Sequence, residues 1–149
     1  MRCYAPFLVL FVLGCLPPTS PSEDLAFATA ISSPVFKSGD PVTIRITVTN
    51  HGSKTRTLLG DACQNSFSVI NGANQVVAPG SRVCTAAVYS RELKFNETYV
   101  FVHQWNGETT AAGSGAVTYL APASYRLRGF VSVEGQQLAS PEAIVKITP

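Results

Sequence analysis

Hydrophobic and polar side chains alternate with a period of two along most of the chain after residue 24. The clearest stretch alternates four aliphatic residues with Thr and Arg: Val42, Ile44, Ile46 and Val48. A period of two places these side chains on one face of a β-strand, against a core, and their polar neighbours on the other face. Residues 50–52, Asn-His-Gly, predict a turn after this strand.

Three further segments repeat the pattern. Phe67, Val69 and Val76 form an apolar set, and the pair Asn71-Gly72 between them suits a tight hairpin turn. Near the C-terminus the alternating residues are Tyr125, Leu127 and Gly129, followed by Ala143, Val145 and Ile147. The Gly- and Ala-rich stretch from Thr109 to Ala116 predicts a mobile loop.

The segment from Glu97 to Trp105 is apolar on both faces. Tyr99, Phe101, His103 and Trp105 share one face, and Val100, Val102 and Gln104 share the other. Strands covered on both faces read in this way, so we expect a central strand. The indole N–H of Trp105 needs an acceptor if it is buried.

These short strands and the absence of a helical period predict an all-β fold. We expect one antiparallel immunoglobulin-like β-sandwich of about 7–9 strands over residues 25–149. The composition, 46% hydrophobic and 13% charged, agrees with a packed β domain. The formal charge of +2 falls to +1 without Arg2 and gives no basic footprint for nucleic acid.

The first residues have the layout of an export signal. One positive charge at Arg2 precedes an apolar run from Phe7 to Leu13, and Gly14 and Cys15 follow. The run is shorter than the ~20 residues that a membrane-spanning helix needs. Residues 12–15, Val-Leu-Gly-Cys, resemble the lipobox of bacterial lipoproteins, which implies a lipid on Cys15.

We therefore interpret residues 1–14 as a lipoprotein signal peptide and residues 15–24, rich in Pro and Ser, as a tether. The expected location is the cell envelope, and Leu16 after the cysteine favours an outer membrane where one exists. An ordinary signal that ends near Ser20 is the alternative.

If the chain is exported, each of its four cysteines has an expected role. Cys3 leaves with the signal and Cys15 accepts lipid, so Cys63 and Cys84 remain for a disulfide. Exported proteins fold in an oxidising compartment, where such a pair persists. A metal site at these cysteines would need closely spaced ligands that the sequence lacks.

The sequence offers little for catalysis. Only His51 and His103 could act as imidazole bases, and neither stands in a nucleophile or zinc motif. The carboxylates of Asp40, Asp61 and Glu97 form no recognisable pair. We expect a protein that is not an enzyme, with no cofactor and no metal.

Four segments in order carry a family resemblance: SGDPVTIRITVTNHGSKTRTL from Ser38 to Leu58, FSVI at Phe67, ETYVFVHQWNG and APASYRLRG. Together they resemble the BsuPI-type intracellular proteinase inhibitor domain. The resemblance implies an immunoglobulin-like sandwich with Tyr125 as a tyrosine corner, and an inhibitor of a serine proteinase. Ala123 and Asn96 depart from the Gly and the Pro-Gly turn that the family often has there.

Two functions follow as expectations. The first is a membrane-anchored binding module that acts on a protein partner, with a serine protease as the partner that the resemblance implies. The segment from Gln75 to Cys84, which contains Pro79, is the candidate for a stiff inhibitory loop. The alternative is a structural accessory subunit of a cell-envelope assembly that docks by strand addition.

Overall fold

The computed structural model describes residues 24–60, 63–79, 89–109 and 117–149. The strands are β1 (Leu25–Ile31), β2 (Val35–Lys37), β3 (Val42–Asn50), β4 (Arg56–Gly60), β5 (Ser66–Ile70), β6 (Val76–Pro79), β7 (Tyr89–Leu93), β8 (Thr98–Trp105), β9 (Ala123–Val133), β10 (Gln136–Ala139) and β11 (Ala143–Thr148). No helix capable of crossing a membrane occurs within these ranges.

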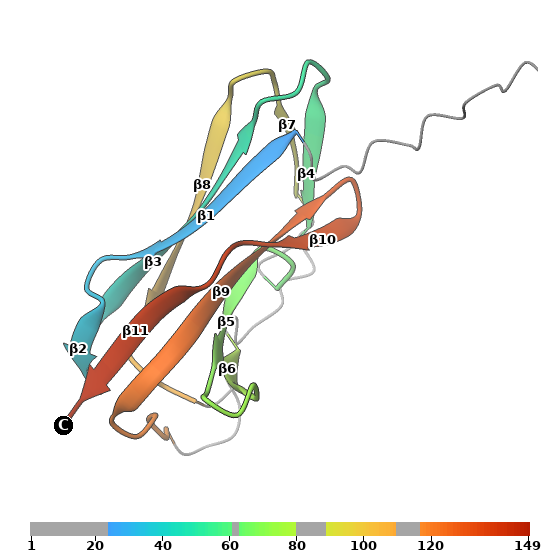
Figure 1. The fold of residues 1–149 in the computed structure, drawn as a ribbon. Helices are drawn as coiled ribbons and strands as arrows, with labels where there is room; N and C mark the ends of the chain where they lie inside the picture. Colours follow the sequence, from blue (N-terminus) through green and yellow to red (C-terminus); the bar gives the residue numbers. More distant parts are fainter. Residues whose placement is uncertain (1–23, 61–62, 80–88, 110–116) are drawn as a thin grey trace, which may run out of the picture.

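The strands form two packed sheets (Figure 1). Sheet A has the order β1-β3-β8, and sheet B has the order β2-β11-β9-β4-β7, to which β5, β6 and β10 are attached. The predicted all-β, immunoglobulin-like sandwich is confirmed. The described residues form eleven strands, more than the expected 7–9, and several are short, such as β2 with three residues.

The N-terminal segment belongs to both sheets. β1 pairs with β3 in sheet A from Leu25↔Asn50 to Ile31↔Ile44, and β2 pairs in parallel with β11 in sheet B. Ser32 closes the first pairing, because its N–H donates to the Thr43 carbonyl at 2.8 Å. The crossing from one sheet to the other therefore occurs within the three residues between β1 and β2.

The core follows the predicted alternation. The aliphatic side chains that are fully enclosed come from both sheets: Val42, Ile44, Ile46, Val48, Leu58, Val69, Leu93, Leu127, Val131, Val133, Val145 and Ile147. Aromatic rings also pack in the interior. Trp105 packs edge-on against Phe36, with ring centroids 5.5 Å apart, and against Phe67 at 6.0 Å.

Both predicted aromatic landmarks have their polar partners. The Trp105 indole N–H donates to the Glu108 carbonyl at 3.1 Å, which satisfies the buried donor. The Tyr125 hydroxyl donates to the Ala121 carbonyl at 2.8 Å, four residues upstream. This is the hydrogen bond of a tyrosine corner, so that expectation is confirmed.

The expectation of a central strand at residues 97–105 is wrong. Among the described strands β8 pairs with β3 alone and lies at the edge of sheet A. Its outer face is apolar but open, since Val102 is 55% exposed. Apolar residues on both faces of a strand therefore did not require a neighbour on each edge.

The hairpin at residues 71–72 is also longer than expected. The turn spans five residues, with the Asn71 N–H donating to the Gln75 carbonyl at 3.0 Å and with Asn74 at a positive φ of 63°. The Asn71 side chain holds the turn, because its Oδ1 accepts the N–H groups of Ala73 and Gln75. Val76 is 61% exposed and does not join the core with Phe67 and Val69.

Candidate binding surface

The outer face of sheet B carries a row of paired side chains. Backbone register aligns Val76 with Ile70, Ile70 with Arg126, and Arg126 with Ile144. Residues paired in this way point to the same face of a sheet. The row therefore crosses β6, β5, β9 and β11 with two exposed aliphatic side chains at its ends.

A shallow groove of about 200 Å³ lies over part of this row. Its lining comes from the end of β5, the following turn, β9 and β11: Ile70, Asn71, Gly72, Ser124, Tyr125, Arg126 and Ile144. Ile144 is 71% exposed, the largest exposed fraction of the described large hydrophobic side chains, whereas Ile70 is buried. We call this set, together with Val76, the groove face.

Arg126 is held firmly within the groove face. Its guanidinium donates to Glu142 at 3.1 Å, to the Asn71 carbonyl at 3.3 Å and to Asn74 Oδ1 at 2.5 Å. Glu142 also accepts from Arg128. Two arginines share one carboxylate, so the cluster keeps a net positive charge.

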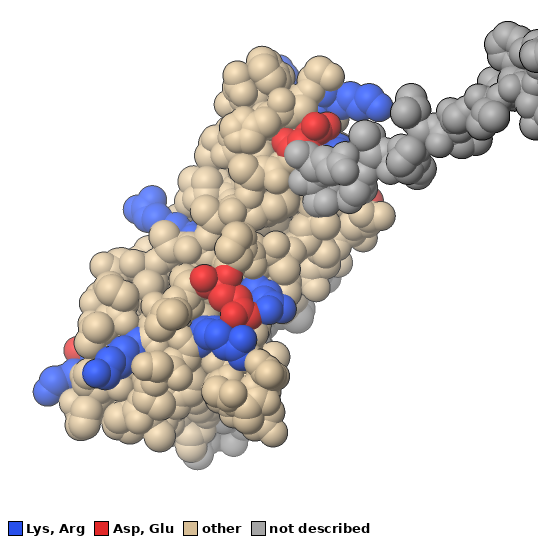
Figure 2. Space-filling view, viewed as in Figure 1, with Lys and Arg blue, Asp and Glu red and all other residues tan. Residues whose placement is uncertain are grey.

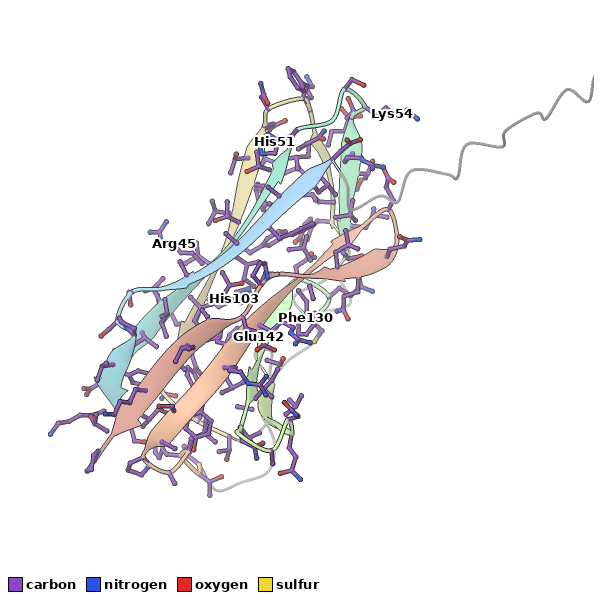
Figure 3. All side chains as sticks on the ribbon, in the orientation of Figure 1. Arg45, His51, Lys54, His103, Phe130 and Glu142 are labelled. Carbon is purple, nitrogen blue, oxygen red and sulfur yellow. The ribbon has the colours of Figure 1, made fainter. Side chains whose placement is uncertain are left out.

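The cluster of Arg126, Arg128 and Glu142 lies in the middle of the face that Figure 2 shows. Figure 2 shows acidic and basic atoms gathered there, surrounded by uncharged surface, and Figure 3 labels Glu142 on the same face. A fixed positive group flanked by exposed aliphatic side chains suits contact with another protein, because apolar contact supplies affinity and the guanidinium supplies direction.

His103 lies on the inner face of β8, the face that it shares with Phe101 and Trp105. Its ring is 5.7 Å from that of Phe67, and its Nε2 is buried with no partner among the described residues. Burial lowers the pKa of His103 below its ordinary value of 6.5, and a hydrogen bond to the backbone of Asn65 opposes the change. The other histidine, His51, is exposed in the turn after β3, as predicted.

Of the three acidic residues considered in the sequence, the structure describes Asp40 and Glu97, which lie in different turns. Asp40 is exposed beside β2, Glu97 lies in the turn before β8, and Asp61 is outside the described residues. The Lys94 N–H donates to Glu97 at 2.9 Å and lowers the pKa of Glu97. Within the described ranges, no three His, Cys, Asp or Glu side chains lie close enough to hold a metal ion.

The sites predicted from cysteine lie mostly outside the described residues. Cys15 and Cys84 are both outside, and Cys63 is half-buried in the turn between β4 and β5. Lipidation of Cys15 and the Cys63–Cys84 disulfide therefore stay predictions.

Four of the ten residues of the predicted inhibitory loop form a strand instead. Val76 to Pro79 forms β6 and pairs with β5, so it is not a free loop. Residues 80–84 lie outside the described residues, as does residue range 110–116 of the predicted mobile loop.

The groove face was missed from the sequence, although one signal was present. Arg126 and Arg128 are two residues apart on one strand and therefore point to the same face. Their partner Glu142 comes from the segment after β10, and its position follows only from the pairing of β11 with β9.

Comparison with known proteins shows a likeness of fold alone. No protein-family model and no curated protein matches the chain. The β-glucosidase EmGH1 of Erythrobacter marinus aligns at a TM-score of 0.51 and 11% identity, over 83% of this chain and 15% of the glucosidase chain. The chain thus corresponds to a small part of that enzyme, and at this identity the match concerns the sandwich only.

Two other solved structures align less well. The sporulation control protein Spo0M of Bacillus subtilis has a TM-score of 0.47 at 11% identity, with 85% of this chain and 50% of that chain covered. The alkylpurine DNA glycosylase AlkC of Pseudomonas fluorescens has a TM-score of 0.48 at 9% identity, with 85% and 31% covered.

Proposed function

We propose that this protein is an exported lipoprotein, anchored through Cys15, whose β-sandwich is a non-catalytic binding module. Its contact surface is the groove face. The observation that carries this proposal is the placement of exposed Ile144 and Val76 in one row with a firmly held Arg126.

The geometry of the row supports a protein partner rather than a small molecule. Small-molecule pockets are usually concave spaces of about 300–1,000 Å³ that enclose most of the ligand. The groove is smaller, about 200 Å³, and Ile144 at its border is largely exposed. A shallow groove bordered by exposed aliphatic side chains can lie against another protein, and Arg is among the residues enriched at protein interfaces.

The partner class to test first is a serine proteinase, as the BsuPI-type resemblance implies. The full chain is titrated against trypsin-like, chymotrypsin-like and subtilisin-like enzymes. Ile144→Asp replaces an exposed aliphatic side chain of the groove face, opposite Arg126, by a carboxylate. Val102→Asp makes the same change on the outer face of sheet A, opposite Arg45, where Val102 is 55% exposed. We expect inhibition that weakens about tenfold or more with Ile144→Asp, which corresponds to 1.4 kcal/mol, and that persists with Val102→Asp.

If none of these enzymes is inhibited, a serine proteinase is excluded as the partner. If inhibition weakens equally in both variants, the groove face is excluded as the contact surface. A photo-crosslinking residue then tests the module itself. Placed at position 144 in envelope preparations, it is expected to give discrete protein adducts that the same residue at position 102 does not give. Adducts at neither position, or equally at both, would contradict the proposal.

A further inference from the structure

One end of the sandwich presents an exposed aromatic side chain on a closed turn. Phe95 lies between β7 and β8 and is 60% exposed. The turn is closed twice, because the Glu97 N–H donates to the Lys94 carbonyl at 3.0 Å and the Lys94 N–H donates to the Glu97 carboxylate at 2.9 Å. Asn96 adopts a positive φ of 58°, which Asn tolerates better than most residues. Phe95 therefore projects from a defined turn.

Asn50 joins this turn to the neighbouring one. Its side chain is fully buried, and its amide donates to the Lys54 carbonyl at 2.8 Å and to the Leu93 carbonyl at 2.9 Å. The Asn96 N–H in turn donates to the Asn50 carbonyl at 2.7 Å. The β3–β4 and β7–β8 turns thus form one unit, which we call the tip; Figure 3 labels His51 and Lys54 at this end.

The N-terminal segment enters the sandwich at the tip. The His51 N–H donates to the Asp24 carbonyl at 2.8 Å, and Leu25 pairs with Asn50. The chain that leads back to Cys15 therefore starts beside the turn that carries Phe95.

The length of that chain limits which end of the sandwich can meet a membrane. Eight residues, 16–23, separate Cys15 from Asp24 and span at most about 25–30 Å when extended. β9 alone has 11 residues, or roughly 36 Å at the usual rise of a strand. The tip is within reach of the bilayer, whereas the opposite end lies about a further strand length away.

We propose that Phe95 inserts into the headgroup region of the bilayer that holds the lipid on Cys15, so that the sandwich rests on the membrane by its tip. This inference depends on the lipid anchor of the proposed function. The exposed side chains of Lys94 and Lys54 flank the contact and face the phosphates, while their stems lie along the apolar boundary. The groove face then stands on the flank of the domain, open to a partner.

Tryptophan fluorescence in the full lipidated chain tests the contact. Phe95→Trp is reconstituted into vesicles of phosphatidylcholine and phosphatidylglycerol with brominated acyl chains, and Ile144→Trp is the matched control. The native Trp105 is 6% exposed at the other end of β8 and supplies the background. An aromatic ring about 5–10 Å deep in the boundary lies near the bromines, so we expect roughly twofold quenching of the added fluorescence for Phe95→Trp and none for Ile144→Trp.

Equal quenching in the two variants, or none in Phe95→Trp, would overturn the inference. Mass spectrometry of the N-terminus separates this result from a failure of the anchor. A lipid on Cys15 without quenching refutes the tip contact alone, and an unmodified N-terminus refutes the anchor together with the contact that depends on it. Circular dichroism of both variants confirms that each is folded before the measurement.

Discussion

Gly129 on β9 lies directly against Thr29 on β1, with no space between them for a side chain. A Cβ at position 129 would overlap the Thr29 hydroxyl and would lie 2.9 Å from Cγ1 of Ile46. Thr29 is itself fixed, because its hydroxyl is 2.5 Å from that of Ser140. The two sheets can therefore pack this tightly at Gly129 because the residue has no side chain.

Gly129→Ala is accordingly expected to destabilise the fold by about 1–3 kcal/mol, because the added methyl must displace packed atoms of Thr29 and Ile46 in sheet A. Urea denaturation measures the change in the free energy of unfolding. Gly72→Ala is the matched control, since a Cβ there meets nothing within 4 Å. A loss for Gly72→Ala as large as that for Gly129→Ala would show that close packing is not the cause.

Tyr125→Phe removes only the hydroxyl that closes the tyrosine corner. The bond to the Ala121 carbonyl is 2.8 Å long, and its loss leaves that carbonyl without this donor. We expect a destabilisation of about 1–2 kcal/mol in thermal or urea unfolding. Tyr119→Phe alters a tyrosine that is 47% exposed and should leave stability unchanged. If the two variants unfold alike, the corner does not contribute.

The half-buried ring of His103 predicts a dependence of stability on pH. Because burial lowers the pKa of His103 in the folded state, the unfolded chain binds the proton more readily. The contribution is complete above the ordinary pKa of 6.5 and is lost as pH falls from there through the lowered folded value.

The measurement is the free energy of unfolding between neutral pH and pH 5. We expect wild type to lose more stability over this range than His103→Phe, which has no titrating group at this position. A slope in His103→Phe as steep as that of wild type would contradict this assignment.

The disulfide predicted from the sequence is testable by alkylation. Exported protein, denatured without reductant, should show no label on Cys63 or Cys84, and labelling of both after reduction. Replacing both cysteines by Ser should cost about 3 kcal/mol, because the bridge closes a loop of about 22 residues. Free thiols in unreduced material would refute the pairing.

The core could be predicted because its signal is local. Val42 to Val48 alternate without interruption, and all four aliphatic side chains are buried as expected. The hydrogen bonds of Trp105 and Tyr125 were also predictable from nearby sequence. A buried indole N–H needs an acceptor, and a tyrosine just after a turn can donate its hydroxyl to a carbonyl a few residues upstream.

The order of the strands and the groove face depend on distant segments. The position of β8 in its sheet depends on which strands pair with it, and the residues of β8 alone do not predict those partners. In the same way, Ile70 and Ile144 are 74 positions apart and face one groove only through their shared neighbour Arg126. Asn50, a turn residue by its sequence, proved to be the buried link between two turns.

The crossing of β1 and β2 between the sheets has a mechanical consequence. Ladder hydrogen bonds run perpendicular to their strands, so tension along the strand axis at Asp24 loads the seven residue pairs of β1 and β3 together in shear. β2 adds a second attachment, because it pairs with β11 near the C-terminus. Force applied to the chain at Asp24 along the strand axis would thus have to break several hydrogen bonds at once instead of breaking them one after another.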